Sequence, residues 1–466
     1  MKKLLWFSLS VLMALTALSA CTKDNGDGGG DSNVRPEKFG DDLFIKFTDP
    51  KSGVVSYQFR NEVLDRGACN TQSNYYVTKA MTDDERYFYL AYSSREKNGN
   101  APSEQATYVV DLKTGKMWEF PKTSGYPYID PEEDVFYYLV LGASSGGVRD
   151  SGQFYKKDLK TGEFKALAKI PKSVAPTGSY INRAVSHISL TQDRQKVFLD
   201  AVVGSTFIQG MLNLYTGDWE EWGRNKDWHL THALISPVND DEVLIAADTW
   251  DLSDGTTIKV GTDEHGWFRR MNLMTHSTTK NEKTGGYSTI RTIQPGEDGG
   301  ATHEGWCADG NWTYWCSGGV HLRNLRSSQI TTAWTKGVYE YNTEMERATH
   351  CNYSIDRNYV VYDDDYPWGP YTQSFYRGSP WRVHFINRKT GKIVDIYSAL
   401  KPITTIGKQS TIHPDPHPHF VCNDKYIVCT AADGKNEDGT DIEYGGYGGY
   451  LHWSITPVDQ LIQLTK

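Results

Sequence analysis

The chain has 466 residues, of which 23% are charged, and its formal net charge is −9 at pH 7. This charge excludes a broad basic surface for nucleic acid or long polyanions, so we expect no nucleic-acid partner. Aromatic residues make up 13%, with 29 Tyr and 14 Trp, and there are 43 Gly. Such a composition favours an all-β protein with many turns and with aromatic surfaces that suit sugar rings.

The N-terminus has the pattern of a targeting signal, and we do not expect it to be part of the folded domain. Lys2 and Lys3 precede a short apolar run over 4–18, and Leu18-Ser-Ala-Cys21 resembles a bacterial lipoprotein cleavage box in which Cys21 is acylated. A plain secretory signal or a membrane span are the alternatives, although the run is short for a span. Residues 22–40 form an acidic, Gly-rich tether. We therefore expect a Gram-negative lipoprotein of the outer membrane, cell surface or periplasm, held by its lipid alone, with a folded part over 41–466.

The remaining cysteines follow no zinc-binding spacing. Such a compartment permits disulfides, but the spacing does not define their pairing. The six residues are Cys69, Cys307, Cys316, Cys351, Cys422 and Cys429.

A strand, a polar turn and a second strand recur along the chain. The turns contain Thr-Gly at 114–115, 161–162, 216–217 and 390–391. Gly supplies the positive φ that such hairpins need. From 114 to 161 is 47 residues and from 161 to 216 is 55, whereas from 216 to 390 is 174. The longest interval leaves room for two degenerate copies, expected around Met271 and Val338.

A second pattern places a histidine six residues before a turn Asp or Asn. It occurs at His187, His303, His350 and His417, and His232 fits with one extra residue. Two earlier units carry aromatic residues there, around 75–76 and 126–128. Seven units of this kind predict a seven-bladed β-propeller, whose last unit, about 403–466, closes on a strand over 43–47. Two tandem β-sandwiches are the alternative. In a propeller the histidines would ring one mouth of the channel.

The segment His413-Pro-Asp-Pro-His-Pro-His419 is the densest group of potential ligands in the chain. Its prolines favour an extended backbone, in which His413, Asp415, His417 and His419 share a face. Imidazole and carboxylate ligands suit Mn²⁺, Fe²⁺ or Zn²⁺. A Pro-rich surface loop without a metal is the alternative.

Four of these segments resemble motifs of the oligogalacturonide lyase family. They are the stretch from Thr231 onward, Thr302-His-Glu-Gly-Trp306, His350-Cys-Asn-Tyr-Ser-Ile-Asp356 and Asp415-Pro-His-Pro-His-Phe420. The resemblance implies a seven-bladed propeller that cleaves short uronic-acid oligosaccharides by metal-assisted β-elimination, leaving 4,5-unsaturated products. Mn²⁺ is the metal that we expect.

The same resemblance assigns roles to individual residues. It makes His232 the catalytic base and His303 and His417 metal ligands. Asp415 stands where the family has a histidine and Ile412 where it has a glutamine, so Asp415, His413 or Gln409 are candidates for the remaining ligand positions. The strand over 205–210 lacks the family's catalytic arginine. Arg183 is the candidate replacement; a different substrate or a loss of turnover are the alternatives.

The other histidines and aromatic residues at the same phase are candidates for contact with the substrate. Packing between blades is the alternative for each, and Glu304 is a candidate partner that orients a ligand imidazole. A glycan-binding propeller without turnover and a protein-interaction platform are the competing functions. The candidates are His187, His350, His419, Tyr76 and Trp306, with Tyr75, Tyr126, Tyr128 and Trp228 as further stacking residues.

Overall fold

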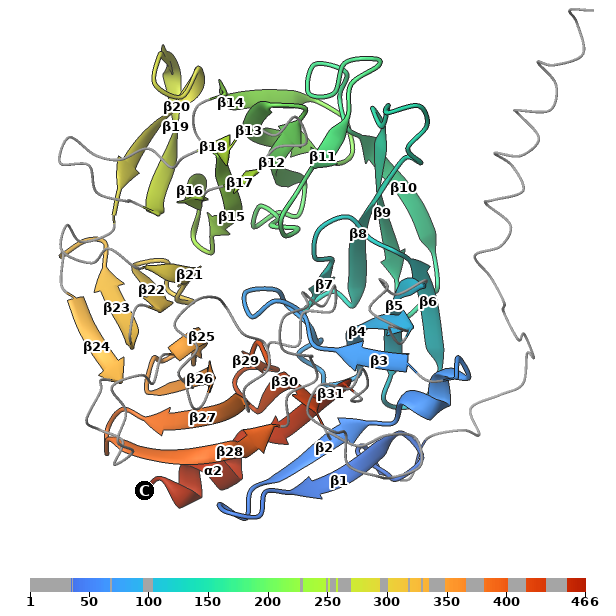
Figure 1. The fold of residues 1–466 in the computed structure, drawn as a ribbon, viewed down its shortest axis with the longest axis vertical. Helices are drawn as coiled ribbons and strands as arrows, with labels where there is room; N and C mark the ends of the chain where they lie inside the picture. The colour runs from blue at the N-terminus through green and yellow to red at the C-terminus, as the bar shows by residue number, and fades with distance from the viewer. Residues whose placement is uncertain are drawn as a thin grey trace, which may run out of the picture.

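A computed structural model describes most of the chain after residue 34. Within it, seven β-sheets stand around a common centre (Figure 1). The predicted seven-bladed propeller is thus confirmed, and the tandem-sandwich alternative is wrong. The described residues are 35, 37–67, 69–94, 104–226, 229–248, 250–251, 257–258, 270–293, 301–316, 319–327, 330–334, 348–365, 381–400, 416–432 and 451–466.

The first four blades follow one another along the chain, each numbered from its innermost strand outward. Blade 1 contains β3 (Cys69–Gln72), β4 (Tyr87–Ser94), β5 (Gln105–Asp111) and β6 (Met117–Pro121). Blade 2 contains β7 (Tyr128–Asp130), β8 (Val135–Leu141), β9 (Gly152–Asp158) and β10 (Phe164–Lys169). Blade 3 contains β11 (Ile181–Arg183), β12 (Lys196–Val203), β13 (Thr206–Asn213) and β14 (Trp219–Asn225). Blade 4 contains β15 (Leu230–Ser236), β16 (Asn239–Ala247), β19 (Met271–Asn281) and β20 (Gly286–Thr292).

The remaining blades complete the circle. Blade 5 contains β21 (Thr302–Trp306), β22 (Trp312–Cys316), β23 (Val320–Asn324) and β24 (Ile330–Trp334). Blade 6 contains β25 (Ala348–Tyr353), β26 (Tyr359–Asp365), β27 (Trp381–Asn387) and β28 (Lys392–Leu400). Blade 7 contains β29 (His419–Val421), β30 (Tyr426–Ala432), β31 (Leu451–Pro457), β2 (Val55–Phe59) and β1 (Phe44–Thr48). Outside the blades lie the pair β17 (Trp250–Asp251) and β18 (Thr257–Ile258), the 3₁₀ helix η1 (Asn61–Leu64) and α2 (Val458–Leu464).

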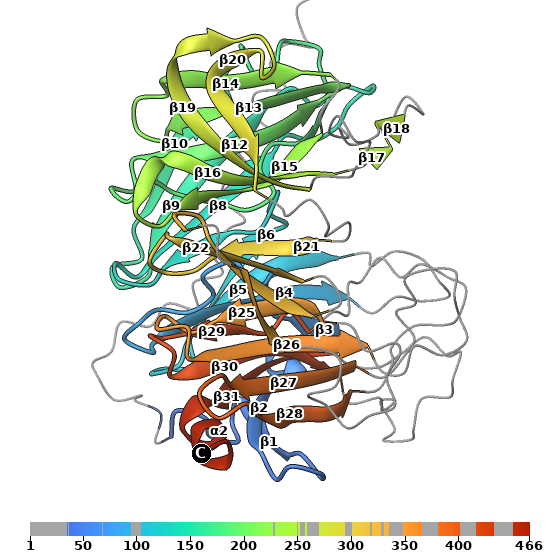
Figure 2. The ribbon, with the colours of Figure 1, turned by 90° about the vertical axis from the view of Figure 1, so that its left-hand side faces the viewer.

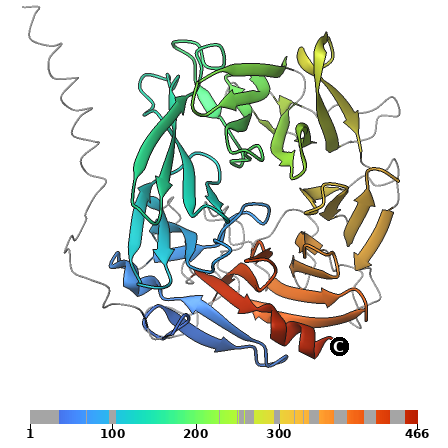
Figure 3. The ribbon, with the colours of Figure 1, turned by 180° about the vertical axis from the view of Figure 1, so that it is seen from behind.

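Blade 7 joins the two ends of the fold. β31 pairs with β2 through Tyr57 and Ile455, and β1 adds the outermost strand. Figure 3 shows the blue N-terminal strands beside the red C-terminal ones. The predicted closing segment, 43–47, therefore overlaps β1, whereas the direct partner of the C-terminal strand is β2. Because the C-terminal segment supplies only three strands of this sheet, both ends of the fold hold the circle closed.

The outer hairpins form for a local reason that the sequence shows. Asp111, Asp158, Asn213 and Asn387 each end a third strand, and each side chain accepts a hydrogen bond from the backbone N–H two residues on. The glycine of each turn has φ of 71–78°. Blade 4 has the same turn after Asn281, and blade 5 has it after Asn324. Val338, where we expected a copy, lies outside the described residues.

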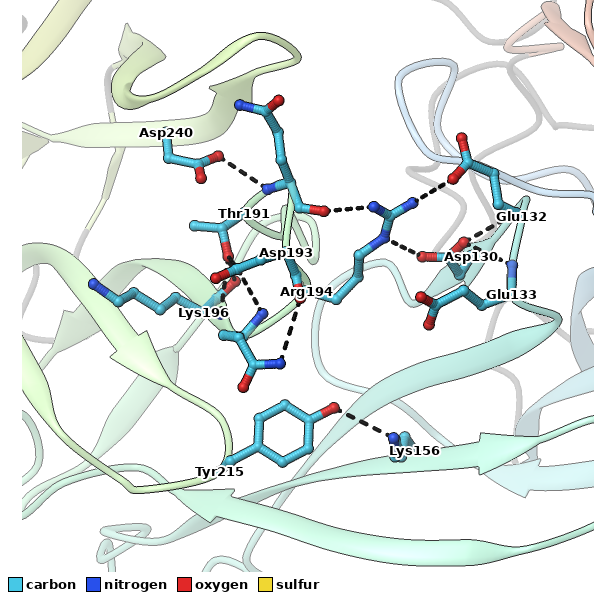
Figure 4. Close-up of polar contacts among 12 residues, drawn as sticks. Asp130, Glu132, Glu133, Lys156, Thr191, Asp193, Arg194, Lys196, Tyr215 and Asp240 are labelled. Atoms are coloured by element: carbon cyan, nitrogen blue, oxygen red, sulfur yellow. Dashed lines mark hydrogen bonds and ion pairs between the residues drawn. The ribbon is translucent and has the colours of Figure 1, made fainter.

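The two faces of the ring are unlike. One face, here called the opening face, carries the starts of the innermost strands and the connections from second to third strands; β17 and β18 project from it (Figure 2). The other, the turn face, carries the tight turns. There Arg194 of blade 3 donates to Asp130 (2.8 Å) and Glu132 (3.0 Å) of blade 2 (Figure 4). Arg357 of blade 6 likewise pairs with Asp309 of blade 5.

The described cysteines and helices bear on the predictions made for the compartment. All six cysteines that the structure describes are buried free thiols. Within the same described ranges, no helix has both the length and the apolar character needed to cross a bilayer. Cys21 and residues 22–34 of the tether lie outside the described residues, so acylation stays a prediction, whereas Arg35 at the end of the tether donates to the carbonyl of Leu112 (2.8 Å).

Candidate functional site

Three of the predicted site histidines share an unusual backbone conformation. The φ values of His232, His303 and His417 are 54°, 56° and 49°. Few residues other than glycine adopt this left-handed region, and such strain often marks a functional site. The pairing register also shifts next to His232 and His303. A bulge of this kind changes the direction of a side chain, so the same local distortion presents a histidine in three different blades.

Histidines from three blades meet at one place. The ring centre of His350 lies 4.1 Å from that of His303 and 4.2 Å from that of His417. The three imidazoles are thus close neighbours. Within the described ranges, however, no group of three or more His, Cys, Asp or Glu side chains is arranged so that it could hold a metal ion. Asp415 and His413 lie outside those ranges, as does Gln409. We name His303, His350 and His417 the imidazole cluster.

Asp363 of β26 forms hydrogen bonds with two histidines of the imidazole cluster. Its carboxylate accepts hydrogen bonds from the backbone N–H of His350 (2.8 Å) and of His417 (3.0 Å). It also lies 3.0 Å from Nδ1 of His350, and both side chains are almost fully buried. Because a carboxylate accepts, Nδ1 of His350 carries the proton and Nε2 is left as the potential ligand atom. Asp363 was not among the predicted site residues, although a run of three aspartates at the end of the otherwise apolar strand Tyr359–Asp365 was a signal.

Tyr75 lies between the imidazole cluster and His232. Its ring stacks at 5.8 Å from His232 and 4.8 Å from His187, and its edge contacts His417 at 5.0 Å. The residue belongs to the loop between β3 and β4, which reaches into the centre of the ring (Figure 1). Only 9% of Tyr75 is exposed. One buried aromatic ring thus connects the predicted base with the predicted ligands.

His232 lies in surroundings that disfavour its protonated form. Burial, followed by the positive charge of Arg270, lowers the pKa of His232 well below its ordinary value. The side chain still has 26% exposure, so contact with solvent limits this effect. Nε2 lies 3.9 Å from Oδ2 of Asp248. A neutral imidazole can accept a proton, and a nearby carboxylate can stabilise the cation that results.

Two arginines flank His232. Arg270 donates from Nε to Glu304 (2.9 Å), and its Nη1 lies 3.2 Å from Asp248. Burial alone would lower the pKa of Arg270, but the two carboxylates raise it overall, so the residue is a permanent cation. Arg183, the predicted replacement for the missing arginine, also opposes protonation of His232, and its Nη2 lies 3.1 Å from Nε2 of His229. Arg270 and Asp248 were not predicted, because neither belongs to a recurring motif.

The other histidines that we predicted as substrate contacts, His187 and His419, are buried and contact neighbouring residues of the protein. His187 stacks between Tyr75 and Tyr126, and burial, then Arg183, lowers its pKa to about 3. His419 lies 2.9 Å from the carbonyl of His417, and burial lowers its pKa to about 4.

The remaining aromatic candidates are also held by the protein. Tyr76 donates to the carbonyl of Glu304 (3.0 Å), and Trp306 donates to that of Leu234 (2.9 Å). Tyr128 packs against Tyr137. Contact of all these residues with a substrate stays a prediction. Trp228 lies outside the described residues.

Comparisons with known proteins bear on the fold. No family model and no curated protein sequence matches the chain. Among solved structures, an oligogalacturonate lyase from Vibrio parahaemolyticus is similar with a TM-score of 0.59 and 16% identity over 92% of this chain and 99% of that one. An oligogalacturonate lyase in complex with manganese is similar with a TM-score of 0.57 and 16% identity over 89% and 96%. TolB from Acinetobacter baumannii also matches, with a TM-score of only 0.36. At these identities the likeness shows the propeller fold alone.

Proposed function

We propose that the protein is a polysaccharide lyase that cleaves short uronic-acid oligosaccharides by β-elimination with the help of a divalent metal ion. The observation that carries the proposal is that the Tyr75 ring contacts both the neutral His232 and His417 of the cluster of three imidazoles. The resemblance of two solved oligogalacturonate lyases to the whole fold supports it.

The imidazole cluster fits a metal ion by its chemistry. His303, His350 and His417 would supply nitrogen ligands, and Asp363 fixes the His350 ring as a carboxylate commonly does behind a ligand histidine. Imidazole nitrogen ligands suit Fe²⁺ and Zn²⁺, whereas the manganese complex of a similar structure favours Mn²⁺. When bound, the ion would neutralise the substrate carboxylate and stabilise the charge that develops next to it.

His232 would carry out the proton transfer. Its neutral imidazole accepts the proton from C5 of the uronide, the C5–H electron pair forms the C4–C5 double bond, and the C4–O bond breaks. The departing oxygen takes a proton from water. Asp248, at 3.9 Å, is placed to stabilise the imidazolium of His232 until that proton is released. A base of this kind contributes roughly 10²–10⁴-fold to the rate.

The direct test follows the ultraviolet absorbance of the unsaturated uronide after the purified protein is mixed with oligogalacturonate and Mn²⁺. We expect the absorbance to rise, and we expect His232→Ala to abolish the rise while the metal content measured by mass spectrometry stays unchanged. Loss of the metal from that variant would make His232 a ligand and not the base.

A glycan-binding propeller without turnover is the second candidate. The absence of an arginine from 205–210 favours it. Sugar binding measured by calorimetry, with no rise in absorbance on any uronide tested, would establish this function and exclude the lyase.

We also propose that the protein is anchored to the envelope by a lipid on Cys21. The cleavage-box sequence before this residue supports the proposal. Full-length protein should partition into the detergent phase, whereas the Cys21→Ser variant should not. Equal partition of the two would contradict acylation.

A further inference from the structure

We propose that Arg270 is a positioning residue that joins the two halves of the site, holding Asp248 beside the base His232 and Glu304 beside the ligand His303. The inference rests on the proposed lyase function and adds a residue that no sequence motif indicates.

Arg270 is a buried side chain whose guanidinium contacts two carboxylates, those of Glu304 and Asp248. The residue directly precedes β19 of blade 4, and its Nε donates to Glu304 on β21 of blade 5 at 2.9 Å. Its Nη1 lies 3.2 Å from Asp248, which directly follows β16. The side chains of Arg270 and Glu304 are 9% and 1% exposed. A planar guanidinium in this position fixes the directions of two carboxylates on adjacent blades.

Both residues that Arg270 contacts, Asp248 and Glu304, are adjacent to a group with a proposed chemical role. Asp248 places its Oδ2 at 3.9 Å from Nε2 of His232. Glu304 follows His303 in the chain, and its carbonyl accepts a hydrogen bond from Tyr76. A displacement of Arg270 would therefore move the partner of the base and the backbone next to a ligand together.

Stability alone is a poor explanation for such a group. Removing a guanidinium and a carboxylate from water costs several kcal/mol each, and apolar side chains of similar volume would often fill the same space at no loss. Apolar packing does fill other contacts between blades, such as the cluster that contains Leu139 of blade 2 with Val197 and Ile208 of blade 3. A buried charged network beside a channel histidine is more typical of a functional site.

Arg270 also sets the charge around His232. The groups that act on this imidazole are the cations of Arg270 and Arg183, the rings of His187, His303 and Tyr75, and the carboxylate of Asp248. Loss of the Arg270 cation removes a charge that opposes protonation and leaves Asp248 without its partner. Both changes raise the pKa of His232, so the neutral form that accepts the proton becomes scarce at a higher pH.

The experiment compares the full-length protein with Arg270→Met, Arg270→Lys and, as a control, Arg194→Met on the turn face. In the absence of substrate, NMR titration of the His232 ring, assigned with His232→Gln, should show a pKa that is higher in Arg270→Met by about one unit. Arg270→Lys keeps the positive charge but loses the planar guanidinium that donates to two carboxylates, so the His232 pKa should stay near that of the wild type. Arg194→Met should leave the pKa unchanged.

Kinetics provide a second readout. With Mn²⁺ and oligogalacturonate, the acid limb of kcat/KM should move to higher pH in Arg270→Met. Arg270→Lys should keep the limb and lose roughly ten-fold in kcat, because the hydrogen-bond geometry is lost. A His232 pKa in Arg270→Met that does not differ from that of the wild type overturns the inference, whether or not the wild type is a lyase. An inactive wild type with the expected NMR shift overturns only the lyase assignment.

Discussion

The two faces of the propeller use the same repeat for different purposes. At the turn face, Arg194 and Arg357 connect each turn to the preceding blade through carboxylates, some of which solvent reaches: Glu132 and Asp309 are 69% and 33% exposed. At the opening face, Asp363 and Arg270 are buried, and they hold histidines or their neighbours. The difference indicates that one end of the innermost strands connects blades, whereas the other is built to hold reactive groups at fixed positions.

Because the two kinds of contact differ in burial, breaking them should reduce the free energy of unfolding by different amounts. An exposed ion pair contributes about 0–1 kcal/mol to stability. Removing one partner of a buried charged pair costs about 3–5 kcal/mol, because the other partner stays behind in a medium that solvates it poorly. Substitutions at the opening face should therefore affect both stability and function, and those at the turn face only stability.

The largest effect is expected for Asp363→Ala. The variant loses the acceptor of the His350 and His417 backbone N–H groups and the partner of the His350 ring. We expect a loss of about 3 kcal/mol in the free energy of unfolding. Affinity for Mn²⁺ should fall about 10–100-fold. Chemical denaturation and metal titration by calorimetry measure the two effects.

Asp309→Ala on the turn face is the matched control for Asp363→Ala. Its carboxylate pairs with Arg357 and accepts from the backbone N–H of Asn311, and within the described residues it has no hydrogen bond or ion pair to a histidine. We expect it to leave metal affinity unchanged. If both variants lost the same amount of metal affinity, the difference between the faces would not hold.

A smaller effect concerns the pH dependence of stability. The pKa of buried His187 is about 3, below the ordinary value of about 6.5, so the unfolded state binds more protons between these values. The contribution of His187 is fully present above about pH 6.5 and is lost as the pH falls toward 3. His187→Phe keeps the stacking on Tyr75 and Tyr126 but cannot titrate. Its free energy of unfolding should thus fall less steeply below pH 6.5, as denaturation at a series of pH values would show.

Tyr126→Phe is the control for that measurement, since it preserves the stacked ring without changing a group that titrates in this range. It should keep the wild-type slope. A His187→Phe variant with an unchanged slope would mean that His187 is reached by protons in the folded state.

The sequence predicted those parts of the molecule that depend on local patterns. The Thr-Gly turns form because an Asp or Asn side chain and a glycine with positive φ lie within a few residues of each other. The seven-fold repeat and the phase of the histidines follow from the same periodicity. Asp363, Asp248 and Arg270 are different, because their positions matter only after strands distant in sequence pack together.

The positive φ values of the site histidines were also beyond prediction. Their sequences contain no glycine at the strained position, and the conformation is held by contacts with other blades. The backbone N–H of His232 donates to Ser186 of blade 3, for example, and that of His417 donates to Asp363 of blade 6. Such strain is a property of the assembled ring and not of any one segment.

The smallest effect is expected for Arg194→Met. This variant loses the hydrogen bonds to Asp130 and Glu132 that connect blades 2 and 3. Asp130 is fully buried, but it still accepts hydrogen bonds from the backbone N–H groups of Glu132 and Glu133, and Glu132 is mostly exposed. We therefore expect a loss of about 1 kcal/mol, somewhat above that of a fully exposed pair. Thermal unfolding measures this loss, and kcat/KM on oligogalacturonate should stay within about two-fold of the wild type. A large fall in kcat/KM without a fall in stability would show that the turn face is coupled to the site, and the separation of the two faces would then be wrong.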